Sequence, residues 1–311
     1  MSDHMLKVER KLSDAFLDKL MKKAPTVYGV SDWFSVPYQE DGIHWHRLDI
    51  HFPTEQHHSL PAILYLHGGG WSTGDKAFFR HYCRTLAQAG YVVFNANYRL
   101  VPDYRHPAQV LDAIAAARWV LDHGADFGAD TGRFFLAGDS AGAHLAAITA
   151  ALCTNPEYAE KYGYTDRIAG IRPTGVLLLC GAFDMQTALK SKFPRIRKYV
   201  QGLLDIRKPQ KLTEASDWDE ISPLRHITKD FPPTFITDAE PDRFIEENRA
   251  MIRKLGQMGV EHDALLLGAK DGALLHDYQV EYFTAAFGAC MEAVLHFLKK
   301  TARMPEDIFE L

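Results

Sequence analysis

Residues Gly138-Asp139-Ser140-Ala141-Gly142 decide the fold of this chain, because they join a short apolar stretch to an alanine-rich one. Residues 134–137 are predicted to form a buried strand, and residues 141–152 a helix. A serine between two such elements lies on a sharp turn that exposes its hydroxyl. Glycines two positions to either side leave room where neighbouring backbone passes closely. The pattern therefore predicts that Ser140 is a nucleophile at the end of a strand.

A second motif, His67-Gly68-Gly69-Gly70-Trp71, follows a predicted strand over residues 62–66. Three adjacent glycines let backbone amides point toward a substrate that lies close to the loop. Cleavage of an ester passes through an oxyanion, which fixed amide donors of this kind stabilise. No Lys-Ser or Lys-Thr pair follows the glycines, which argues against a phosphate-binding loop. The motif predicts an oxyanion hole, completed by the amide of Ala141.

A serine nucleophile needs a base and an acid that orients the base, and with this kind of turn the chain order is serine, acid, histidine. His276 follows a predicted strand over residues 264–267 and precedes the last predicted helix, so its loop can reach Ser140. Asp242 follows the predicted strand 233–237 and is the first candidate for the acid. Asp184 is the second candidate and Asp238 the third.

The rest of the chain alternates strands with helices. A helix is expected over residues 5–23, a β-hairpin over 33–53, and a basic helical insertion from 185 to about 218. Short apolar strands that alternate with helices favour a mainly parallel sheet covered on both faces. Further strands are expected at 91–95 and 175–180, and further helices at 110–121, 244–258 and 279–299.

The composition of the chain disfavours nucleic-acid-binding and membrane-spanning proteins. The chain has 311 residues, of which 47% are hydrophobic and 24% charged, with a formal net charge of −5. This charge disfavours binding to nucleic acid or to an anionic membrane. No run approaches about 18 apolar residues and the N-terminus lacks a signal-peptide pattern, so we expect a cytoplasmic protein without a membrane span. The four cysteines form no CxxC pair, and Cys153 and Cys180 are expected to be buried free thiols.

Taken together, these motifs resemble the hormone-sensitive-lipase-like carboxylesterases, also called the alpha/beta hydrolase fold-3 family. The resemblance spans roughly residues 61–299 in consistent order. It is carried by the two glycine motifs, by Asp242 in its loop, by His276, and by the stretches Tyr98-Arg99-Leu100-Val101-Pro102 and Ser222-Pro223-Leu224.

The resemblance implies a single α/β-hydrolase domain over residues 1–311. Its mostly parallel central sheet would be flanked by helices, with lid elements at about 1–40 and 185–220. It implies a Ser140, Asp242 and His276 triad. The oxyanion hole would come from the amides of Gly69, Gly70 and Ala141, with Gly68 as a further loop donor.

The expected activity is that of a serine carboxylesterase acting on short to medium acyl esters. The partner is then a small-molecule ester, no cofactor or metal is expected, and the resemblance allows a homodimer. An arylformamidase or amidase with the same triad is one alternative, and a non-catalytic ligand-binding protein is another. His44-x-His46 has metal-ligand spacing, but no third ligand is evident nearby, and a hairpin position is the preferred interpretation.

Two departures from the family pattern bear on the pocket. Asp277-Tyr278 follows His276 where a Gly-Phe pair is usual, and Arg243 follows Asp242 where an apolar residue or a proline is usual. These differences leave the predicted chemistry in place but make the pocket lining hard to predict.

Overall fold

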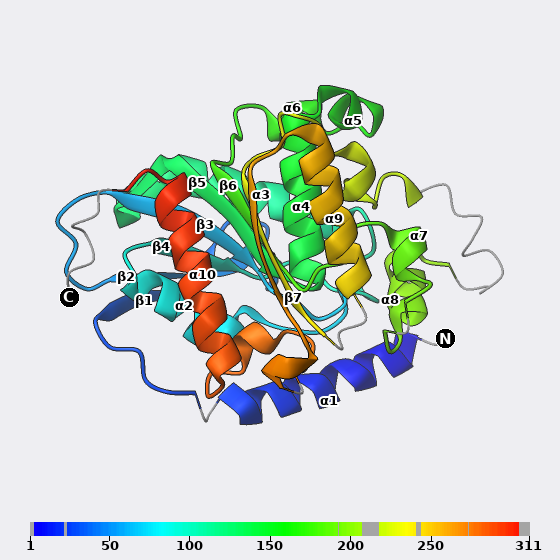
Figure 1. The fold of residues 1–311 in the computed structure, drawn as a ribbon, viewed down its shortest axis with the longest axis horizontal. Helices are drawn as coiled ribbons and strands as arrows, with labels where there is room; N and C mark the ends of the chain where they lie inside the picture. The colour runs from blue at the N-terminus through cyan, green and yellow to red at the C-terminus, as the bar shows by residue number, and fades with distance from the viewer. Residues whose placement is uncertain are drawn as a thin grey trace.

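An eight-stranded sheet runs through the chain in the order β1-β2-β4-β3-β5-β6-β7-β8 (Figure 1). The computed structural model describes residues 3–21, 24–191, 193–206, 218–240, 244–272 and 274–304. β1 and β2 pair antiparallel, as do β2 and β4, and every other neighbouring pair is parallel. The strands are β1 Val30–Pro37, β2 Arg47–Pro53, β3 Leu60–Leu66, β4 Val92–Ala96, β5 Ala129–Asp139, β6 Gly175–Leu179, β7 Thr234–Ala239 and β8 His262–Leu267.

Helices cover both faces of the sheet because the central strands are apolar on both sides. In β3, Leu64 belongs to one apolar core, while Ile63 and Tyr65 belong to the other. The first core is closed by α3, α4 and α9, and the second by α2 and α10 (Figure 1). The helices are α1 Asp3–Met21, α2 Arg80–Gln88, α3 Ala108–His123, α4 Ala141–Thr154, α5 Pro156–Lys161, α6 Thr165–Ile168, α7 Met185–Ala188, α8 Ile196–Leu203, α9 Ile245–Met258 and α10 Ala285–Thr301.

The predicted fold class is confirmed, with local differences. The expected hairpin is the β1–β2 pair, and each expected strand has its counterpart in the sheet. The last helix begins at Ala285, not at 279, because a 3₁₀ turn over Tyr278–Val280 comes first and the side chain of Thr284 caps the helix at the amide of Phe287. Helices α2, α5 and α6 were not expected from the sequence.

The two segments expected to form a lid contain helices outside the sheet. In the first, α1 lies along one end of the molecule, while Val30–Pro37 is the edge strand β1 (Figure 1). In the second, α7 and α8 stand between β6 and β7. Leu6 of α1 is buried and lies against Gly202 of α8, so the two segments meet. Within the described residues, no helix combines the length and the apolar character that crossing a membrane requires.

Candidate active site

Ser140 occupies a strained turn between β5 and α4. Its backbone has φ +49° and ψ −113°, a conformation that a residue with a side chain rarely adopts. The turn is held because the amide of Ser140 donates to the carbonyl of Leu179 at 2.8 Å. A Cβ on Gly142 would lie 1.9 Å from the carbonyl oxygen of Leu66, and one on Gly138 would lie 2.4 Å from the backbone of Gly142. The two glycines are therefore required by close backbone packing, as the sequence indicated.

His276 lies beside this serine. Its Nε2 atom is 2.8 Å from the Oγ atom of Ser140, although 136 residues separate the two in sequence. The imidazole follows β8 in a loop and packs edge-on against two phenyl rings, with centroids 4.7 Å from Phe193 and 5.7 Å from Phe244. A histidine in contact with a serine hydroxyl can accept the proton of that hydroxyl. The structure therefore brings together the serine and the histidine singled out in the sequence.

Of the three candidate acids, two lie within the described residues. Asp242, the first candidate, lies outside the described residues. Asp184 is the N-cap of α7, and its carboxylate pairs with Arg225 at 2.9 Å. Asp238 is fully buried and accepts a hydrogen bond from Nδ2 of Asn248 at 2.7 Å. Both alternative candidates therefore take part in structural hydrogen bonds of their own.

The glycine loop folds back on itself next to Ser140. Gly69 and Gly70 have φ values of +124° and +58°, which favour glycine. The carbonyl of Gly69 accepts from the amide of Ser72 at 3.1 Å and from that of Thr73 at 3.0 Å, closing a tight turn. The turn lines the same cavity as Ser140 and Ala141, the first residue of α4. The residues whose amides are predicted to bind an oxyanion thus line the same cavity as the serine.

Asp139, the residue before the nucleophile, ties the glycine loop to the nucleophile turn. Its Oδ1 atom accepts from the Tyr65 hydroxyl at 2.7 Å and from the amide of Gly68 at 3.0 Å. The Gly68 amide is therefore already engaged, which argues against its expected role as a further oxyanion donor. Burial raises the pKa of the Asp139 carboxyl well above its usual range, and the negative charge of Asp277 adds to the effect. Only the tertiary fold brings these groups together, so no local sequence pattern marks them.

A cavity of about 660 Å³ opens over the serine. Its walls come from α1 through Ser13, from the insertion through Phe193 and Tyr199, and from the glycine loop. Its described lining is mainly apolar, and aromatic rings supply much of it. A mainly apolar pocket with a few convergent polar groups is typical of a small-molecule site.

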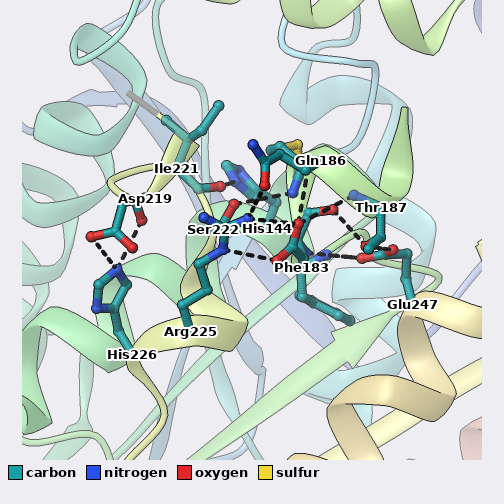
Figure 2. A network of polar contacts seen from close by, with 12 residues as sticks. His144, Phe183, Gln186, Thr187, Asp219, Ile221, Ser222, Arg225, His226 and Glu247 are labelled. Atoms are coloured by element: carbon teal, nitrogen blue, oxygen red, sulfur yellow. Dashed lines mark hydrogen bonds and ion pairs between the residues drawn. The ribbon is translucent and has the colours of Figure 1, made fainter. Parts of the chain in front are cut away.

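Polar contacts anchor the base of the insertion to the core, and Figure 2 shows how they converge. Glu247 of α9 is buried, and its Oε2 atom accepts from the amides of Phe183 and Asp184 at 3.1 and 2.9 Å. Its Oε1 atom accepts from the hydroxyl of Thr187. Nearby, the hydroxyl of Ser222 accepts from the amide of Met185 at 3.1 Å. Burial raises the pKa of Glu247, against the lowering effect of these hydrogen bonds.

Several histidines other than His276 have structural partners. His226 and His262 form hydrogen bonds with the backbone oxygens of Asp219 and Val260, respectively. His46 precedes β2 and bonds the carboxylates of Asp41 and Asp112. Among the described residues, no group of three or more potential ligands has the arrangement of a metal site. The described thiols, Cys83, Cys153, Cys180 and Cys290, are buried and form no disulfide with one another.

Comparison with known proteins agrees with this geometry. A family model described as alpha/beta hydrolase fold matches residues 63–270. Esterase LipI of Mycobacterium tuberculosis is 47% identical over 91 residues, a match that covers 29% of this chain and 28% of that protein. Carboxylesterase NlhH of the same organism is 37% identical over 243 residues, covering 76% of this chain and 72% of NlhH.

Among solved structures, inhibited esterase B from Lactobacillus rhamnosis superimposes with a TM-score of 0.86 at 23% identity and covers 96% of both chains. At that identity the likeness supports the fold alone, whereas the family model and NlhH extend over most of the chain. The chain therefore belongs to the alpha/beta hydrolase fold-3 family of carboxylic ester hydrolases.

Proposed function

We propose that this chain is a serine carboxylesterase that cleaves short to medium acyl esters through an acyl-enzyme. The observation that carries the proposal is the 2.8 Å contact between Nε2 of His276 and Oγ of Ser140 at the floor of an apolar cavity. The names of LipI and NlhH, an esterase and a carboxylesterase, point to the same chemistry.

In the first half of the reaction, His276 takes the proton of Ser140 as the hydroxyl oxygen attacks the ester carbonyl. The C–O bond to the alcohol then breaks, and His276 gives its proton to the departing oxygen. In the second half, His276 removes a proton from water as the water oxygen attacks the acyl carbon. The bond from that carbon to Oγ of Ser140 then breaks, the acid leaves, and His276 returns the proton to Ser140. Asp242 is the proposed partner of the imidazole, holding its orientation and stabilising its charged form.

The oxyanion of each tetrahedral intermediate would lie between the amides of Gly69, Gly70 and Ala141. Ala141 begins α4, a helix of 14 residues, so the positive end of the helix dipole favours negative charge at this point. The role of Gly68 is instead to fix the loop, because its amide donates to Asp139.

The lid of the proposed enzyme consists of α1 and the segment that carries α7 and α8. Both segments contribute side chains to the cavity wall, Ser13 from the first and Tyr199 from the second. A cavity of about 660 Å³ accommodates a small ester with a short or medium acyl chain, which is the substrate class proposed here.

The proposal is tested by hydrolysis of p-nitrophenyl esters from acetate to decanoate. We expect the wild type to turn over the short esters fastest, Ser140→Ala to lose activity, and Asp242→Asn to be strongly reduced. Full activity of Asp242→Asn would indicate that Asp184 or Asp238 is the acid of the triad. Failure of the wild type on every ester, with turnover of aryl formamides, would replace the esterase with the arylformamidase alternative.

A further inference from the structure

The turn that follows His276 presents two carboxylates to the cavity. Tyr278 and Gln279 are fully buried and bond to groups of the core, so they fix the turn against the sheet. Asp277, whose φ is +61°, immediately precedes Tyr278, and Glu281 follows shortly after Gln279. Both acidic residues line the cavity. The 3₁₀ turn thereby places both acidic side chains in the wall next to the reacting serine.

The position of each carboxylate is specific. The Oδ2 atom of Asp277 lies 3.4 Å from Nε2 of His276, the same nitrogen that faces Ser140. The Oε1 atom of Glu281 is shielded from solvent and has no hydrogen-bond partner among the described residues. No lysine or arginine belongs to the described lining of this cavity. The described wall is therefore acidic on the side of the cavity next to His276.

The remaining wall is aromatic. Trp71 and Tyr199 line the cavity together with Phe193 and Phe244, whose rings stack with centroids 4.4 Å apart. Aromatic faces attract ammonium groups through their quadrupole, and the attraction strengthens where water is excluded. Carboxylates and aromatic rings around one space favour a positively charged ligand group over a neutral or negative one.

The same geometry indicates which part of the ester would carry the positive charge. In the proposed mechanism, Nε2 of His276 hands its proton to the oxygen of the departing alcohol. In that mechanism, a carboxylate 3.4 Å from this nitrogen would lie beside the departing alcohol. A negative charge beside the oxyanion would oppose catalysis, whereas a negative charge beside a cationic alcohol attracts the substrate.

We infer that this site selects esters whose alcohol part carries a positive charge, such as a quaternary or protonated amine a few bonds from the ester oxygen. Asp277 and Glu281 act as the specificity-determining residues for that group, and the aromatic wall receives its alkyl substituents. The inference rests on the proposed esterase function and names the substrate class of the same site.

The test uses two acetate esters of nearly equal shape, choline acetate and its uncharged carbon isostere, 3,3-dimethylbutyl acetate. The measured quantity is the ratio of their kcat/KM values, which cancels any effect of a variant on the chemistry common to both. We expect the wild type to favour the cation by about tenfold or more at low salt, and high salt to reduce the ratio. The double variant Asp277→Asn with Glu281→Gln is expected to bring the ratio close to one.

Two further variants complete the design. Glu281→Gln alone is expected to lower the ratio severalfold, and it serves if the double variant does not fold. Glu160→Gln, an exposed acidic position on α5, is the matched control and should leave the ratio unchanged.

The inference is overturned if the wild type hydrolyses the neutral ester at least as well as the cationic one. It is also overturned if the ratio stays high in the carboxylate variants. In both cases turnover of the neutral ester, lost in Ser140→Ala, would leave the esterase proposal standing. Absence of hydrolysis of either ester would count against the esterase proposal and the inference together.

Discussion

The Oδ1 atom of Asp139 accepts a hydrogen bond from the backbone amide of Gly68 at 3.0 Å, so the residue before the nucleophile holds the first peptide of the glycine loop. A Cβ on Gly68 would lie 2.1 Å from the other carboxyl oxygen, which shows how closely the two segments approach. The nucleophile and the loop proposed to bind the oxyanion are thus joined by a single buried side chain.

This arrangement predicts different outcomes for two substitutions of Asp139. Burial raises the pKa of its carboxyl well above the usual range, and Asp139→Asn is a neutral isostere that keeps an oxygen acceptor for the Gly68 amide. We expect Asp139→Asn to keep kcat/KM within about fivefold, and Asp139→Ala to lower it about 100-fold, the usual cost of misplacing an oxyanion donor. Steady-state kinetics with p-nitrophenyl butyrate distinguishes them. Equal losses in both variants would mean that the ionised carboxylate itself is needed.

The packing at the nucleophile turn predicts a contrast between two Gly→Ala substitutions. In Gly142→Ala the new methyl group would lie 1.9 Å from the carbonyl oxygen of Leu66, so the turn must shift and the protein should lose several degrees of melting temperature and its activity. Gly288 lies in α10, where an added Cβ would meet nothing within 4 Å, and Gly288→Ala should stabilise the helix by about 0.5–1 kcal/mol. Thermal unfolding of both variants measures the contrast, and a folded, active Gly142→Ala would contradict this account of the turn.

The buried His144 predicts a pH dependence of stability. Burial lowers the pKa of its imidazole to about 4, and its Nε2 atom lies 2.8 Å from the carbonyl oxygen of Ile221 (Figure 2). The unfolded chain, with a histidine pKa of about 6.5, binds more protons in the window between these values. Stability therefore rises with pH across this window, and acidification to pH 4.5 costs the native state about 2–3 kcal/mol through this group.

Denaturant titrations of the wild type and His144→Gln at pH 7.5 and 4.5 isolate the contribution, because the Gln amide can still donate to Ile221. We expect the wild type to lose more stability on acidification than the variant, by about 2–3 kcal/mol. An identical acid loss in the two proteins would show that His144 titrates normally.

Hydrogen bonds from α1, the N-terminal helix, predict that this helix stabilises the glycine loop. Arg10 donates from Nε to the carbonyl of Ser72 at 2.8 Å and from Nη2 to the carbonyl of Val101, so it bonds directly to the segment that closes the loop. Arg10→Met keeps the aliphatic stem but removes both bonds, and should lower kcat/KM about tenfold, mainly through kcat.

Lys7 provides the control for Arg10, because it lies on the same helix and pairs only with Asp103 among the described contacts. That ion pair is exposed, and such pairs contribute little. Lys7→Met should change kcat/KM less than twofold in the same assay. Equal effects of the two substitutions would point to a general loosening of α1 and not to support of the loop.

The sequence predicted the features that depend on local pattern. The glycines around Ser140 and the run Gly68 to Gly70 indicate close backbone approach. In the structure, both motifs lie at the carboxyl ends of central strands, β5 and β3 respectively. The sequence predicts that the last helix begins at residue 279, six residues before the observed start of α10. The apolar pattern fits a helix, but Tyr278 and Gln279 are buried in the turn that precedes it.

Contacts between distant segments could not be predicted in this way. Glu247 lies in a stretch rich in charged residues, yet it is buried against the amides of Phe183 and Asp184. Asp139 likewise acquires its partners only when β3 and β5 pair. The acid of the triad remains a prediction, since Asp242 lies outside the described residues.

Covalent labelling measures whether Ser140 is an activated nucleophile. The intact protein is treated with a fluorophosphonate, digested, and mapped by mass spectrometry alongside Ser140→Ala and His276→Ala. We expect one phosphonyl adduct on Ser140, absent from Ser140→Ala and formed far more slowly in His276→Ala. A folded wild type that takes no label, or takes it on another residue, would show that Ser140 is not an activated nucleophile and would favour a hydrolase-fold protein that binds its ligand without turnover.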